Sequence, residues 1–193
     1  LRTAGAWHQD ADTKFIECGY VGFNAVYAPD ERAVVWDGLE LATFETSKQA
    51  NGRQIKASQQ MALDQRNASY IIRTLAGDRI LGGKTANGTW IDELHIRDCM
   101  VARVRESMNT LLMNQRGSKV NAGDVGLALI ENALSSALQP FVAADAISKY
   151  EVDMSHATID FATRTLNDVR FTATLSGAII RVVINGTLTN DEG

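Results

Sequence analysis

The sequence has little cysteine, no surplus of positive charge and no long apolar run. Its two cysteines, Cys18 and Cys99, are too few for a disulfide framework in a chain of 193 residues. Each lies in an apolar segment, so we expect reduced, buried thiols that bind no metal. Because no run of 18 apolar residues occurs, we expect no insertion into a membrane.

The charge balance argues against nucleic acid as the main partner. The 23 acidic residues outnumber the 19 Lys and Arg, which gives a formal net charge of -4 at pH 7. Phosphate binding needs a surplus of basic side chains on one face, and no basic stripe occurs. The composition is otherwise that of an ordinary globular domain, with 45% hydrophobic residues. The chain begins at Leu1 without a methionine, so we expect further sequence upstream of it.

The first third of the sequence has a mixed pattern. Phe15 to Val21 and Ala33 to Trp36 are rich in aromatic and aliphatic residues and predict two strands, separated by a turn at Pro29 and Asp30. Ile55 to Arg66 predicts a helix, and Ser69 to Leu75 predicts a further strand.

Two long helices are predicted in the middle of the chain. The first runs from Trp90 to Gln115, and Thr89 and Asp92 have the spacing of a capping box at its start. The second runs from Ala122 to Leu138 and is expected to end at Pro140. The apolar positions of both helices recur at spacings of three and four. The residues expected in the core are Leu94, Val101, Met108, Ile130 and Leu134.

Beyond the second helix the apolar period changes to two. Tyr150 and Val152, like Phe171 and Ala173, alternate with polar residues and predict half-buried strands. Ala178 to Ile184 is apolar at nearly every position, as in a strand covered on both faces. The expected fold class is therefore mixed α/β, with a central mixed β-sheet flanked by two long helices.

The segment AGDRILGGKT, from Ala76 to Thr85, has some features of a phosphate-binding loop. A P-loop needs one glycine, four further residues and then Gly-Lys-Ser/Thr, so that successive N–H groups surround the phosphates. Here Gly77 stands one residue too early, and Asp78 occupies the position of the required glycine. We favour a glycine-rich turn and expect no nucleotide cofactor.

Other candidate chemistry is sparse. Asp92, His95 and Cys99 share one face of the predicted helix and have the side-chain types that ligate zinc, but no second cluster completes a tetrahedral site. We favour a capped, salt-bridged first turn and expect no metal ion. No Gly-x-Ser-x-Gly elbow or Cys/His pairing predicts a nucleophile, so no catalytic residue is assigned.

Three segments, in this order, resemble the sheath proteins of contractile phage tails. Gly82 to Glu106 resembles the Gly-x-Thr-x-x-Gly-x-Trp-Ile-Asp-Glu signature that opens a long helix in that family. Asn121 to Leu134 is similar to the next helix, and Arg170 to Thr189 is similar to the final strands. The chain departs from many relatives at Thr163 to Asp168, where they carry prolines and adjacent arginines.

This resemblance implies a C-terminal core domain of a sheath subunit, which lies against the tail tube. Residues 1–193 would form this single domain, with a loosely matching β/α part at 1–88 and two helices plus the last strands at 89–193. Subunits of the family form stacked hexameric rings and exchange strands at their termini. Residues of this chain that are candidates for the contact between subunits are Arg164, Asp168, Arg170 and Arg181.

The implied partners are further copies of the same chain, the tail tube protein, the baseplate and the tail terminator. The implied location is the tail of the virion, after assembly in the host cytoplasm, and the implied role is contraction that drives the tube through the bacterial envelope. Two alternatives stay open at this point. One is another structural component of a phage or contractile injection system, such as a tube or baseplate protein, and the other is an α/β enzyme.

Overall fold

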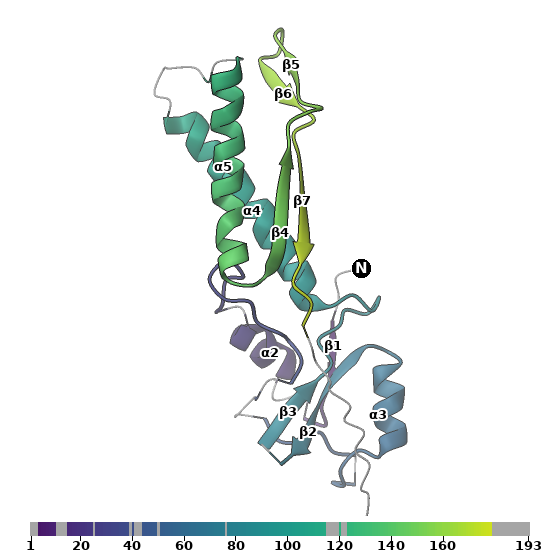
Figure 1. The fold of residues 1–193 in the computed structure, drawn as a ribbon. Coiled ribbons are helices and arrows are strands. Elements are labelled where there is room, and N and C mark those ends of the chain that lie inside the picture. Colours follow the sequence, from purple (N-terminus) through teal and green to yellow (C-terminus); the bar gives the residue numbers. More distant parts are fainter. Residues whose placement is uncertain are drawn as a thin grey trace, which may run out of the picture.

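The structure is a computed structural model with eleven described helices and strands (Figure 1). The residues that it describes are 4–10, 15–24, 26–38, 40, 44–49, 51–75, 77–114, 120 and 123–178. The predicted combination of helices with parallel and antiparallel strands is confirmed. The described strands are divided among three small sheets rather than gathered into one.

The N-terminal part is built on a three-stranded sheet with the order β1-β2-β3. Its strands are β1 (Gly5–Trp7), β2 (Ala68–Thr74) and β3 (Gly77–Leu81). β1 pairs with β2 in parallel, and β3 returns antiparallel to β2. Helices α2 (Ile16–Asn24) and α3 (Ala57–Asp64) complete this part of the molecule.

The core of this part lies between α2 and the β2–β3 hairpin. Its buried residues are Ile16, Tyr20, Trp36, Ile71 and Ile80. The Tyr20 hydroxyl donates to the Trp36 carbonyl oxygen at 2.7 Å, and the two rings meet edge to face at 5.3 Å between centroids. The phenol is thus buried with its hydrogen bond satisfied, as a tyrosine in a core requires.

The second part consists of two long helices and a two-stranded antiparallel ribbon. Helix α4 (Ile91–Asn114) is followed by α5 (Asp124–Ala143), which returns alongside it (Figure 1). Strands β4 (Ile147–Asp153) and β7 (Arg170–Leu175) form the ribbon, and between them the chain makes the hairpin β5 (Thr158–Asp160) and β6 (Thr165–Asn167).

A second core cluster joins the two helices to the ribbon. Its buried members are Ile96, Met100, Leu138, Phe141, Ala146 and Ile147. Of the five residues that were expected in the core, Leu134 is buried and the other four are half-buried. The buried face of α4 is thus rotated from the predicted one, toward Ile96 and Met100.

Several predicted elements are confirmed at nearly their predicted bounds. The helix from Trp90 is α4, the helix from Ile55 is α3, and the strand from Ser69 is β2. The strands predicted around Tyr150 and Phe171 are β4 and β7. The covered strand predicted at Ala178 to Ile184 lies, apart from Ala178, outside the described residues.

Four predictions about these elements are wrong. Phe15 to Val21 is mostly the helix α2, and Ala33 to Trp36 has no regular secondary structure. Part of the predicted glycine-rich turn is instead the strand β3. Helix α5 continues through Pro140 to Ala143, because Phe141 in its last turn is fully buried in the second cluster and offsets the lost hydrogen bond.

Candidate functional site

The β4–β7 ribbon is one of the two-stranded sheets among the described residues. Its register pairs Tyr150 with Ala173 and Val152 with Phe171. Among the described residues, neither strand has a second strand partner. Each therefore has an edge whose alternate N–H and C=O groups are not bonded to a neighbouring strand, which is the usual template for pairing with another chain.

The two faces of the ribbon differ in character. Tyr150, Val152, Phe171 and Ala173 pack against the second core cluster, which fixes the ribbon to α4 and α5. On the other face lie Lys149, Glu151, Thr172 and Thr174, all exposed. The ribbon is thus held by one apolar face while its polar face is exposed, as in a sheet that can accept another strand.

The predicted interface residues are spread along the β5–β6 hairpin and its base. Arg164 closes the turn at the tip, Asp168 follows β6, and Arg170 begins β7; all three are exposed. Within the described part of the chain no salt bridge joins them to one another. Arg181 lies outside the described residues. Their role in subunit contacts stays a prediction.

The tip of this hairpin carries a feature that the sequence reasoning missed. Phe161, in the turn between β5 and β6, is 77% exposed. Its turn is ordered by Asp160, whose carboxylate accepts from the backbone N–H groups of Ala162 and Thr163 and from the Thr163 hydroxyl. These bonds hold the pKa of the Asp160 carboxyl below its usual range. The signal in the sequence is an aromatic residue next to an aspartate turn.

The glycine-rich segment is occupied by contacts within the protein. The Gly82 N–H donates to Asp37 Oδ1 at 2.8 Å, and the Gly83 N–H donates to Ser69 Oγ at 3.3 Å. The Lys84 ammonium lies 4.6 Å from the centroid of the Trp90 ring, as a cation–π contact. The N–H groups that would surround a phosphate in a P-loop are here bonded to Asp37 and Ser69 within the protein, which supports the structural interpretation of the segment.

The three candidate zinc ligands on α4 lie in different surroundings. The His95 ring meets Trp36 edge to face, at 6.1 Å between centroids. The Cys99 thiol lies 3.8 Å from Asp30 Oδ1, and burial raises its pKa. Asp92 has a raised pKa because it is half-buried at the start of the helix. No group of three metal-binding side chains converges anywhere in the described residues.

Both cysteines are free thiols in the structure. Their predicted burial is wrong for Cys18, which is exposed on α2, while Cys99 is half-buried. The reason is the change from strand to helix: at helical spacing Ile16 and Tyr20 face the core together, and Cys18 points away from it.

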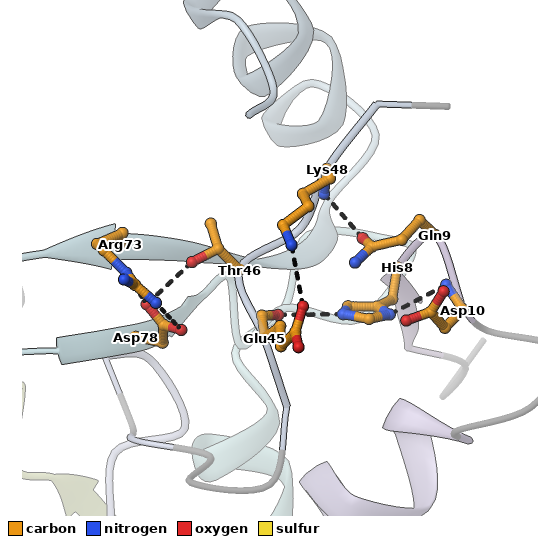
Figure 2. Close-up of polar contacts among 8 residues, drawn as sticks. All are labelled: His8, Gln9, Asp10, Glu45, Thr46, Lys48, Arg73 and Asp78. Atoms are coloured by element: carbon orange, nitrogen blue, oxygen red, sulfur yellow. Dashed lines mark hydrogen bonds and ion pairs between the residues drawn. The ribbon is translucent and has the colours of Figure 1, made fainter. Parts of the chain in front are cut away.

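A group of polar side chains around residues 44–49 is also structural (Figure 2). The buried His8 ring accepts from the Asp10 N–H through Nδ1, so its Nε2 carries the proton and donates to the Glu45 carbonyl oxygen at 3.0 Å. Asp78 accepts from both Arg73 and Thr46. The Arg73 guanidinium lowers the pKa of the Asp78 carboxyl. These bonds fasten the segment to β1 and the β2–β3 hairpin.

An open pocket of about 480 Å³ lies beside α3. Its apolar lining comes from Trp7, Ile55, Ala62 and Leu63, and its remaining lining residues are polar. Helix α3 has no buried residue, so its apolar side faces an incompletely filled space. The described residues that line the pocket include no Asp, Glu, His, Cys or Ser, and thus no general base or nucleophile.

Helix α5 is the one described helix that is long and apolar enough to cross a membrane, by length and composition alone. Core helices pass the same test, and Leu134, Leu138 and Phe141 of α5 are buried against α4 and the ribbon. The helix therefore already has a protein partner for one apolar face. No protein-family model matches the sequence, and a search of the curated proteins finds no match.

Proposed function

We propose that this chain is the core of a contractile tail sheath subunit, a structural protein that polymerises around a tail tube. The observation that carries the proposal is the β4–β7 ribbon, whose inner face is anchored and whose edges have no strand partner in the described residues. Such a ribbon can accept a strand from a neighbouring subunit, and main-chain hydrogen bonds then join two copies whose helices remain rigid.

The segments that resemble the sheath family overlap three of the described elements. The first contains most of α4, the second contains the start of α5, and the third contains β7. All three elements contribute to the second core cluster or its partly buried shell. Among the described residues, the first and third segments therefore meet in this cluster, whereas the cluster members of α5 lie beyond the end of the second segment.

Exposed apolar side chains of the described residues also favour assembly. Large apolar side chains are exposed at Leu112 of α4, Val125 of α5 and Phe161 of the hairpin. Exposed apolar positions of this kind are typical of surfaces that contact other proteins. The described lining of the pocket beside α3, in contrast, lacks the paired acid, base or nucleophile that a catalytic site needs.

Electron microscopy of the protein at its full natural length tests the proposal. We expect hollow, striated cylinders built of stacked rings, with a lumen wide enough for a protein tube. Assembly should be followed over a range of salt concentrations, because exposed charges between subunits are screened by salt. Absence of cylinders under all of these conditions would contradict a sheath, whereas narrow, unstriated tubes would indicate a tube component.

A further inference from the structure

Phe161 is presented as an apolar knob on an ordered turn. It stands at the tip of the β5–β6 hairpin, which extends the β4–β7 ribbon beyond its end (Figure 1). The two short strands hold the turn, together with the hydrogen bonds that Asp160 accepts from Ala162 and Thr163. An aromatic side chain on a preorganised turn is a typical anchor of a protein interface, since little entropy is lost when it binds.

The pocket beside α3 has the properties of a matching hole. It is an open space of about 480 Å³ between α3, Trp7 and the segment that precedes the helix. Trp7 and Leu63 offer apolar surface for an aromatic ring, and Gln59 and Arg66 stand among the polar lining residues. An arginine beside an aromatic ring can stack on its face.

The knob and the hole lie at opposite ends of the molecule. Figure 1 shows the β5–β6 hairpin at one end and α3 at the other, beside the three-stranded sheet. Residues 153–168, which include the hairpin, carry three carboxylates and one Arg. Residues 51–66, which line most of the pocket, carry three Lys or Arg and one carboxylate. The two ends therefore carry opposite net charge.

We propose that Phe161 of one copy inserts into the pocket beside α3 of the next copy. This inference rests on the proposed function, because it names a contact that would join subunits in the polymer. A contact between two different surfaces is head-to-tail: each bound copy still offers a free knob at one end and a free hole at the other. Such contacts do not close into a two-fold dimer and instead extend a ring or a helical filament.

Cross-linking between two single-cysteine proteins tests the contact. In a Cys18→Ser/Cys99→Ser background, one protein carries Ala162→Cys beside the knob and the other carries Gln59→Cys at the pocket. Both positions are exposed, so neither change disturbs the core. A short bifunctional thiol reagent should link the mixed proteins into a heterodimer. Links should be far fewer when Met113→Cys replaces Gln59→Cys, because Met113 is also exposed but lies near the end of α4, away from the pocket.

A second pair of variants tests whether cross-linking depends on Phe161 or on nonspecific hydrophobic association. Phe161→Asp in the Ala162→Cys protein should lower the cross-linking yield about tenfold, which is the usual effect of removing an aromatic anchor. Met113→Asp, at a position that is 79% exposed, should leave the yield unchanged. Thermal melting should be the same for all of these proteins, since both replaced side chains are outside the core.

Each outcome decides the proposal. An undiminished yield with the Phe161→Asp protein overturns the knob, and a heterodimer yield no higher than that of the Met113→Cys control overturns the contact. An intramolecular link in a Gln59→Cys/Ile184→Cys protein, with no heterodimer, would assign the pocket to the chain's own C-terminal residues and so also overturn the contact. Cylinders that form normally from full-length Phe161→Asp protein would remove this contact from the polymer while leaving the proposed function intact.

Discussion

Arg103 of α4 donates from Nε to Oδ2 of Asp30 at 2.6 Å and so joins the long helix to the N-terminal part of the chain. The Asp30 side chain is 11% exposed, and its other oxygen lies 3.8 Å from the Cys99 thiol. Asp30 and Glu106 together raise the pKa of the Arg103 guanidinium. The pair is thus a polar link between the two parts of the molecule. Because the Asp30 carboxylate is largely buried, removal of its cationic partner should lower the free energy of unfolding.

Arg103→Met should therefore destabilise the protein. The methionine keeps the apolar stem of the side chain but leaves the Asp30 carboxylate without its cation, at a cost of about 1–2 kcal/mol. Arg105→Met is the matched control, because Arg105 is exposed and lies on the opposite side of the helix. Urea unfolding of the two variants measures the difference. Equal free energies of unfolding would contradict a structural role for the Asp30–Arg103 pair.

Gly82 is expected to tolerate no side chain. Its φ of +127° is in the region that favours glycine, and a Cβ atom would stand 2.5 Å from Ser69 Oγ and 2.8 Å from Ser69 Cα. Gly82→Ala should lower the free energy of unfolding by about 2–4 kcal/mol through backbone strain and overpacking. Gly22→Ala in α2, where the added atom meets nothing within 4 Å, should be neutral or stabilise the helix. Thermal melts that rank the two variants in the opposite order would refute this packing.

The sequence predicted the long elements well and the short ones poorly. Helix α4 and the strands around Tyr150 and Phe171 have patterns that extend over many residues, so their type is set by periodicity alone. Ile16 to Asn24 is only nine residues long, and its aromatic and β-branched residues favour a strand. The decisive feature was the spacing of Ile16, Tyr20 and Asn24, which all lie on the buried side of the helix.

Other features depend on contacts that no local pattern reveals. The buried face of α4 is set by two different neighbours: Ile91 packs against the first cluster, while Ile96 and Met100 belong to the second. The positions of α4 that pack against other elements therefore do not follow one continuous apolar stripe along the helix. The pocket beside α3 combines Trp7 with residues some fifty positions later in the chain, and the pairing of β1 with β2 and the hydrogen bond from Ser47 to the Trp7 carbonyl oxygen bring them together.

Asp92 should make the stability of the protein depend on pH. Burial at the start of α4 raises its pKa, and its Oδ1 atom is buried without a hydrogen-bond partner in the described structure. Folding therefore favours the protonated form of Asp92. The stabilisation that comes from protonated Asp92 is fully present below the unfolded pKa of about 3.9, and it is lost as the pH rises through the higher folded pKa.

Asp92→Asn should consequently raise the free energy of unfolding at pH 7. The gain should shrink as the pH falls and disappear below about pH 3.9, where the aspartate is protonated in both states. Glu93→Gln, at the exposed neighbouring position, should show no such gain, because only a weak interaction with the helix dipole is lost. Urea unfolding at several pH values measures both; a gain for Asp92→Asn that is independent of pH would exclude titration of Asp92 as its cause.

The two faces of the ribbon allow assembly to be separated from folding. Phe171 packs on the second core cluster, whereas its neighbour Thr172 is exposed on the other face. Phe171→Asp should place an unpaired carboxylate against apolar side chains and loosen the ribbon at a cost of several kcal/mol. Amide hydrogen exchange should then rise throughout β4 and β7, and the full-length protein should form no cylinders.

Thr172→Asp should keep the exchange pattern of the parent chain, because strand alternation directs its side chain to solvent. Loss of cylinders in Thr172→Asp despite an intact ribbon would place a subunit contact on the polar face, and normal cylinders in Phe171→Asp would mean that the ribbon takes no part in assembly.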